Sequence, residues 1–171
     1  LLTRYPDLHV LWFDAHPDFL NEAQSTTHFL DGMSMARVVG LAGSQSGLLR
    51  RDQITLLGGQ EVEEAESQAM TKWGLDCVRL QEIDAWVKGS LPGGDLFLHV
   101  DADVLDPADM PAVDFPVTPG MRAGQLLDVC TRIAATGRLR GIEVTCYNPA
   151  LDEMDRGGRR LRSLIETVLP A

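Results

Sequence analysis

The 171 residues of this chain include 44% hydrophobic and 23% charged side chains, so we expect one globular domain over residues 1–171 with a sizeable core. The formal net charge of −10 argues against a nucleic-acid partner, because phosphate binding needs clustered Lys and Arg and the 15 basic residues are mostly scattered. Three cysteines at irregular spacing and the lack of a long apolar run predict a reduced, cytoplasmic protein without a membrane partner.

Short apolar runs alternate with amphipathic segments along the chain, and these patterns predict buried strands and surface helices. In chain order, the sequence predicts a strand at 10–13, a helix at 32–39, a strand at 54–57, a helix at 62–73, strands at 77–80 and 96–100, a helix at 123–135, a strand at 142–147 and a helix at 158–168. This alternation predicts an α/β fold with a parallel sheet and helices on both faces. Functional groups are then expected at the carboxyl ends of the strands.

Three side chains that can bind a metal follow the first predicted strand. Asp14, His16 and Asp18 occupy alternate positions, and an extended backbone sends alternate side chains to one side. These three groups can therefore converge on one point. Taken alone, an acidic turn after a strand explains the pattern equally well.

A second acidic strand end strengthens the case for metal. Asp101 and Asp103 follow the apolar run at 96–100, again two positions apart. Carboxylates that are buried close together repel one another unless a cation neutralises them. Oxygen ligands combined with imidazole suit Mn²⁺ better than an ion that prefers thiolates, and the number of acids suits two ions that share bridging carboxylates.

The segments WFDAHPD and HVDADVLDP resemble two signature motifs of the arginase, agmatinase and formimidoglutamase family, also called ureohydrolases, and the resemblance extends over almost the whole chain. It implies a three-layer α/β/α fold that is truncated at its N-terminus. It also implies two Mn²⁺ ions that activate a hydroxide, a small guanidino or amidino substrate whose C–N bond is hydrolysed, and a homo-oligomer.

Carried over residue by residue, the resemblance assigns the metal ligands. Asp14 and Asp101 resemble the two acids that bridge the ions. His16 and Asp103 resemble ligands of one ion, and Asp18 resembles a ligand of the other. The family's GGDH motif, whose His binds the same ion as Asp18, does not occur in the sequence. We therefore expect about one tightly held ion per chain.

The expected substrate side of the site departs from the family pattern. Asp31 falls where the family has a proton-shuttle His, with His28 in the preceding loop as the other acid-base candidate. Cys146 falls where the family has a Glu that pairs with the guanidinium of the substrate. The family's Asn is displaced to Asn21, and Glu63 lies in the substrate-facing loop. The resemblance therefore implies a substrate other than ordinary arginine.

Other residues near the motifs are expected to support the metal ligands or a helix. His99 shares a strand face with Asp101 and Asp103, and we expect it to support the ligands from deeper in the sheet without binding metal itself. Glu64 and Glu66 are expected to lie in the solvated first turn of a helix, where acids favour the helix dipole.

Two other classes of protein compete with the hydrolase interpretation. One is a pseudoenzyme that retains metal for stability or assembly but has lost the shuttle His and the Glu that binds guanidinium. The other is a related metal-dependent deacetylase, which shares the fold and an Asp-x-His strand end. The tandem His pair expected of that class does not occur in the sequence, and Asp14 with Asp18 favours two ions over one.

Overall fold

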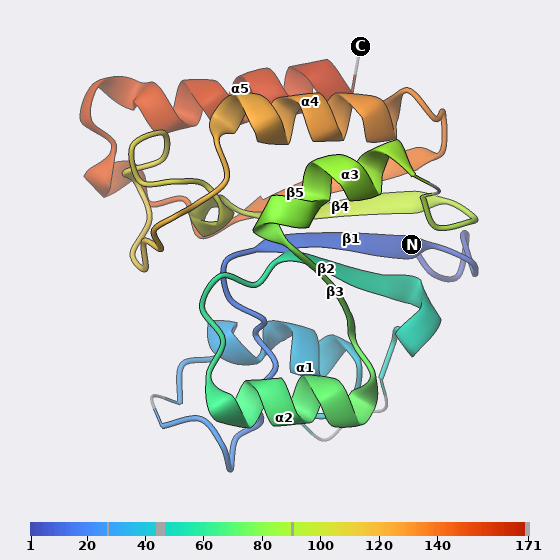
Figure 1. Ribbon diagram of the computed structural model, residues 1–171. Helices are drawn as coiled ribbons and strands as arrows, with labels where there is room; N and C mark the ends of the chain where they lie inside the picture. Colours follow the sequence, from blue (N-terminus) through green and yellow to red (C-terminus); the bar gives the residue numbers. More distant parts are fainter. Residues whose placement is uncertain (27, 44–46, 90, 170–171) are drawn as a thin grey trace.

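A five-stranded parallel sheet organises the protein, whose computed structural model describes residues 1–26, 28–43, 47–89 and 91–169. In spatial order the strands are β3 (Asp76–Arg79), β2 (Ile54–Gly58), β1 (His9–Asp14), β4 (Leu96–Asp101) and β5 (Leu139–Thr145). Each strand runs parallel to its neighbours. The first strand of the chain therefore lies in the middle of the sheet (Figure 1).

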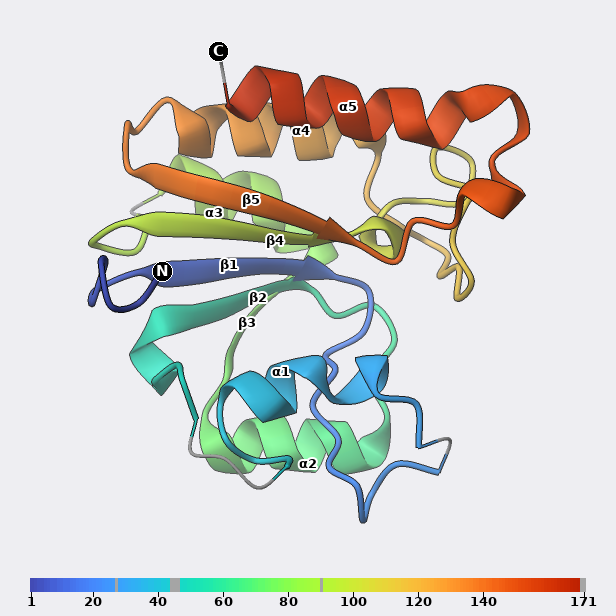
Figure 2. The same ribbon diagram turned by 180° about the vertical axis from the view of Figure 1, so that it is seen from behind.

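Helices cover both faces of this sheet. One face packs against α1 (Ser34–Val38) and α2 (Glu64–Trp73), and the other against α3 (Ile83–Lys88), α4 (Ala123–Ala134) and α5 (Arg156–Val168) (Figures 1 and 2). The predicted three-layer α/β/α arrangement with a parallel sheet is confirmed. Within the described part of the chain, no helix combines the length and the apolar composition that crossing a membrane requires.

The central strand β1 contributes to two separate hydrophobic cores because its side chains alternate between the faces. Leu11 and Phe13 are fully buried in the core that α3, α4 and α5 cover. Val10 and Trp12 belong to the core beneath α1 and α2. A strand that is buried on both faces has a continuous apolar sequence. This element can therefore be predicted from its sequence.

Three elements differ from the sequence-based expectation. The last strand is Leu139–Thr145 and not 142–147, because its first half holds polar and glycine residues that do not form an apolar run. The predicted helix at 32–39 is a 3-10 turn (Asp31–Met33) followed by the short α1. The six-residue α3 (Ile83–Lys88) was not predicted, because it is too short to show a clear helical periodicity.

The carboxyl ends of β1 and β4 lie side by side, because the two strands pair in parallel from His9 with Leu96 to Phe13 with Val100. Each strand ends on the acid that follows the last of these pairs, Asp14 in β1 and Asp101 in β4. On the other side of β1, a Cβ added to Gly58 would lie 2.4 Å from the backbone oxygen of Asp14. Only glycine permits this close approach of the two strands.

Candidate metal centre

Asp14 is the most buried acid at this edge of the sheet, with 1% of its surface exposed. Its Oδ2 accepts a hydrogen bond of 2.9 Å from the indole Nε1 of Trp12, and its Oδ1 accepts one of 2.8 Å from the backbone N–H of His16. Both oxygens are therefore held by hydrogen bonds, one from a residue of β1 itself and one from a residue just after it.

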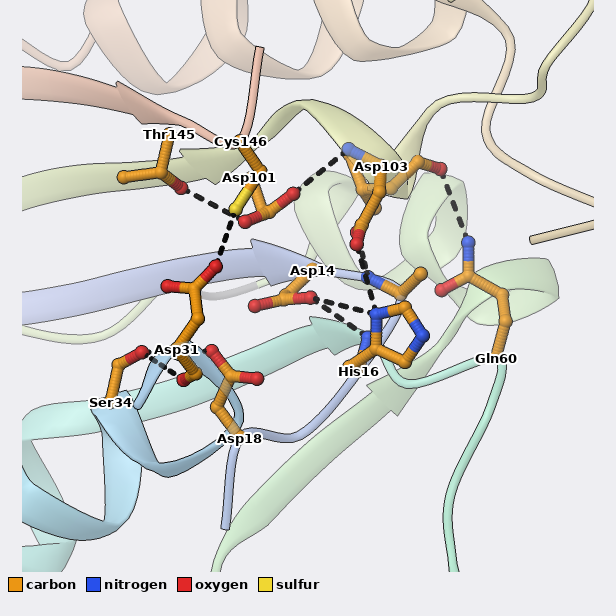
Figure 3. Close-up of polar contacts among 12 residues, drawn as sticks. Asp14, His16, Asp18, Asp31, Ser34, Gln60, Asp101, Asp103, Thr145 and Cys146 are labelled. Atoms are coloured by element: carbon orange, nitrogen blue, oxygen red, sulfur yellow. Dashed lines mark hydrogen bonds and ion pairs between the residues drawn. The ribbon is translucent and has the colours of Figure 1, made fainter. Parts of the chain in front are cut away.

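His16 and Asp103 lie beside Asp14 and connect the ends of β1 and β4 (Figure 3). His16 Nδ1 lies 2.9 Å from Asp103 Oδ2 and 3.9 Å from Asp14 Oδ1. The hydrogen bond with Asp103 raises the pKa of the His16 imidazole above its usual value, although burial acts against it. A proton on His16 thus places positive charge between the two acids, where a cation would also be favoured.

Asp101 is positioned by donors on both sides. Its Oδ2 accepts a hydrogen bond of 3.0 Å from Thr145 Oγ1 at the end of β5, and its Oδ1 accepts one of 2.9 Å from the backbone N–H of Asp103. Thr145 pairs with Asp101 in the strand register, so the sheet itself sets this contact. Thr145 is a site residue that the sequence does not predict, because its contact with Asp101 depends on the pairing of two strands.

Replacing Thr145 with Val should weaken Mn²⁺ binding about 10- to 100-fold, the usual effect of removing a partner that orients a metal ligand. The shape of the side chain is nearly kept, while the hydroxyl donor to Asp101 is lost. Isothermal titration with Mn²⁺ measures the change. Thr131→Val on the exposed side of α4 is the matched control, since the Thr131 hydroxyl bonds only the backbone of its own helix. Unchanged affinity in Thr145→Val would show that the hydroxyl does not support the site.

The acids at this edge hold their protons unusually tightly. Burial, followed by the charge of Asp18, raises the pKa of Asp14 well above its usual range. Burial and the nearby Asp101 raise the pKa of Asp18 to about 8, although a hydrogen bond from the Ser34 hydroxyl opposes this shift. Burial and the charge of Asp103 raise the pKa of Asp101 to about 6. A group of acids that resists ionisation in this way would be relieved by a bound cation.

Among the residues that the structure describes, three overlapping sets of side chains bring potential metal-ligating atoms within 4.8 Å of one another. The sets are Asp14 with His16 and Asp103, Asp14 with His99 and Asp101, and Asp31 with Asp101 and Cys146. Two of the sets share Asp14 and two share Asp101. The structure therefore brings together Asp14, His16, Asp101 and Asp103, as the sequence predicts, while Asp18 stands beside them outside these sets.

The acids face a cavity of about 360 Å³. It is lined by Asp14, His16, Asp18, Leu20, Ser25, Phe29, Asp31, Gly32, Glu61, Glu63, Glu66, Asp101, Asp103, Phe115 and Cys146. The rings of Phe29 and Phe115 lie 5.7 Å apart, and both side chains are more than half exposed. The cavity thus has an acidic floor and two aromatic rings from distant loops.

The expected substrate-side residues divide between this cavity and other places. Asp31, Glu63 and Cys146 line the cavity, and the Cys146 thiol donates a hydrogen bond of 2.9 Å to Asp31 Oδ2 (Figure 3). His28 is exposed and is not among the lining residues. Asn21 faces a separate hollow of about 470 Å³, and its side chain caps the turn that follows it.

Cys146 and Asp18 both hold a backbone conformation that is rare for residues other than glycine. Their φ angles are 57° and 52°, in the left-handed region. Such strain persists only where the surrounding structure enforces it, and it gathers at functional sites. Burial and the charge of Asp101 raise the pKa of the Cys146 thiol, so this sulfur acts as a neutral donor and not as a nucleophile.

The expectation that Glu66 lies in a solvated helix turn is wrong. Glu66 is 5% exposed and lines the cavity, whereas Glu64 is exposed as expected. The Glu66 carboxylate accepts hydrogen bonds from the backbone N–H groups of Phe19 and Glu63. The spacing of Glu63 and Glu66 at the start of α2 is that of a capping box, a signal that could have revealed this inward orientation.

The fold and this edge of the sheet define an α/β protein with a candidate metal centre made of acids and imidazole. A sequence model described as Arginase family matches residues 1–169. The chain belongs to the arginase family.

Individual relatives agree with this assignment. N(omega)-hydroxy-L-arginine amidinohydrolase of Streptomyces lavendulae is 32% identical over 98% of this chain and 61% of its own length. Arginase of Eremothecium gossypii is 28% identical over 91% of this chain and 44% of its own length. The chain therefore spans less than two thirds of the length of these relatives.

Solved structures show the same fold. The crystal structure of arginase from Bacillus cereus has a TM-score of 0.92 at 24% identity, covering 99% of this chain and 64% of that protein. Formimidoylglutamase from Bacillus subtilis has a TM-score of 0.79 at 22% identity, covering 94% of this chain and 52% of that protein.

Proposed function

We propose that residues 1–171 form one domain of a manganese-dependent hydrolase that cleaves a C–N bond in a small guanidino or amidino compound. The observation that carries this proposal is the meeting of ligating side chains from two adjacent strand ends, with Asp14 shared between two sets, at the floor of a 360 Å³ cavity. An acidic cavity also suits a cationic substrate.

The residues present fit Mn²⁺. The sets that contain Asp14 are made of carboxylates and imidazole, with no thiolate, and such ligands favour Mn²⁺ over ions that prefer sulfur. When bound, the ions would supply Lewis-acid chemistry and lower the pKa of water from about 15.7 to about 7, so that hydroxide is available at neutral pH. Asp14, His16, Asp18, Asp101 and Asp103 would hold the ions.

The protein's own groups would position the substrate and move its protons. Asp31 lines the same cavity as the acids, and its Oδ2 accepts the hydrogen bond from Cys146. We assign proton transfer to the leaving nitrogen to Asp31, because His28 lies outside the cavity lining. Glu63 would bind the cationic end of the substrate that lies away from the reacting carbon.

We further propose an N-hydroxyguanidino substrate. Cys146 offers no carboxylate to pair with a guanidinium, and losing such a pair weakens recognition of arginine. An N-hydroxyguanidine is less basic, because its electronegative oxygen withdraws electron density, and it therefore depends less on a paired acid. The relative from Streptomyces lavendulae is named for hydrolysis of such a compound.

The test is hydrolysis by the complete gene product loaded with Mn²⁺. We expect kcat/KM for Nω-hydroxy-L-arginine, measured as hydroxyurea release, to exceed that for L-arginine, measured as urea release, by more than about tenfold. Cys146→Glu should shift the preference toward arginine, because it restores a charged partner. Cys77→Ser, a change at a cysteine outside the cavity lining, is the control for general damage.

Three results would contradict parts of this proposal. A preference for arginine in the unmodified protein would overturn the substrate class. Release of product from agmatine or formimidoyl-glutamate alone would identify another amidino substrate. Mn²⁺ binding without hydrolysis of any of these compounds would instead favour a pseudoenzyme that uses its metal for stability or assembly.

The expectations of a cytoplasmic homo-oligomer stand beside this function as proposals. Cys77, Cys130 and Cys146 are free thiols in the structure, as a reducing compartment would keep them. Gel filtration with light scattering on the complete gene product measures the oligomeric state directly.

A further inference from the structure

A second row of side chains runs directly behind the acids. Trp12 pairs with His99 in the register of β1 and β4, and His99 pairs with Glu143 in the register of β4 and β5. These three residues lie two positions before Asp14, Asp101 and Thr145, respectively. We call Asp14, Asp101 and Thr145 the site row. Because side chains alternate along a strand, both rows point to the same face of the sheet.

His99 is fixed in this row from two sides. Its ring stacks on the Trp12 indole with centroids 3.6 Å apart and planes 23° apart. Its Nδ1 lies 2.6 Å from Glu143 Oε1. Only 5% of the His99 surface is exposed, so its ring is packed within the protein.

The other ring nitrogen of His99, Nε2, has no hydrogen-bond partner among the described residues. A ligating nitrogen of His99 and carboxylate oxygens of Asp14 and Asp101 all lie within 4.8 Å of one another. A buried imidazole that bonds a carboxylate through Nδ1 and has a ligating nitrogen close to two buried acids has the arrangement of a metal ligand. Histidines that bind metal usually donate their second N–H to a carboxylate in this way.

We propose that His99 binds a divalent cation together with Asp14 and Asp101, and that Glu143 is the positioning residue that orients its ring. This cation position is distinct from the one formed by Asp14, His16 and Asp103, although the two sets of residues share Asp14. His99 thereby becomes a ligand, where the sequence alone predicts only a supporting role. The inference rests on the proposed metal centre and specifies how a second ion is held.

The test counts Mn²⁺ ions in the complete gene product by metal analysis after gel filtration, and detects coupling between neighbouring ions by electron paramagnetic resonance. We expect two ions per chain with a spin-coupled signal in the unmodified protein. His99→Gln should retain one ion with an uncoupled signal. Glu143→Gln should keep both sites but weaken the second about 10- to 100-fold.

His9→Gln is the matched control, because His9 is also a buried strand histidine but both of its ring nitrogens already have protein partners. It should keep both ions. Should His99→Gln fail to fold, the affinity change in Glu143→Gln carries the test by itself.

The outcomes separate this inference from the proposed function. Two coupled ions with unchanged affinity in both His99→Gln and Glu143→Gln would overturn the role of His99. One ion in the unmodified protein would also overturn it and would leave the centre of Asp14, His16 and Asp103 intact. An unmodified protein that binds no Mn²⁺ would overturn the proposed function as well.

Discussion

Replacing Asp14 with Asn is expected to abolish stabilisation of the protein by Mn²⁺. The Asp14 carboxylate belongs to both sets of ligating groups in which a histidine takes part, so neither cation position survives its loss. Removing one partner of a buried charged contact costs about 2 to 5 kcal/mol, a factor of roughly 30 to several thousand in Kd. Titration calorimetry and melting curves with and without millimolar Mn²⁺ measure the effect.

The same substitution should act in the opposite direction on the metal-free protein. Asn at position 14 removes one of several acids that repel one another, so the melting temperature in EDTA should rise. Asp128→Asn, the same change on an exposed position of α4, is the control and should alter neither quantity. A variant at position 14 that Mn²⁺ stabilises as much as the unmodified protein would refute the shared role of this acid.

The metal-free protein should lose stability as the pH rises from about 4 to 8. Asp18 and Asp101, with pKa values of about 8 and 6 in the folded state, keep protons that the unfolded chain releases near 3.8. Within this window the folded state binds more protons, so the free energy of unfolding falls as the pH rises. A tenfold change in a proton dissociation constant corresponds to about 1.4 kcal/mol. The free energy of unfolding should therefore fall by several kcal/mol across this pH range.

Urea unfolding in EDTA at pH 5, 6, 7 and 8 measures this slope. Asp18→Asn should flatten it most between pH 6 and 8, where the Asp101 carboxyl is largely ionised in both states. Saturating Mn²⁺ should reverse the slope, because a cation favours the ionised acids. Metal-free protein that gains stability from pH 5 to 8 would contradict the charge repulsion on which the metal argument depends.

The elements that carry the acids were predictable because local sequence determines them. β1 is a continuous apolar run that ends directly at Asp14, and the run at 96–100 ends in the same way at Asp101. Parallel pairing then places both ends at one edge of the sheet. The six-residue α3 escaped prediction because a helix of this length shows less than two turns of periodicity.

The parts of the site that could not be predicted depend on pairs of residues far apart in the chain. Phe29 meets Phe115 through two loops, and His99 meets Glu143 through the register of β4 with β5. Periodicity within either segment carries no information on such contacts. Cys146 follows β5 with a left-handed backbone, so extrapolating the strand by two residues misplaces it.

The long separation in sequence between the two halves of the site has a consequence for the lifetime of the folded protein. His16 and Asp103 are 87 positions apart in the sequence. β1 pairs with β2 and β4, and both of these strands come later in the chain. Such non-local contacts make folding slow, because the loops between the strands must close before the contacts can form. Ions that bind only the assembled site between β1 and β4 stabilise the folded state, and we expect them to act chiefly by slowing unfolding. In a cell short of manganese, the protein would fold at its usual rate but persist for less time before degradation.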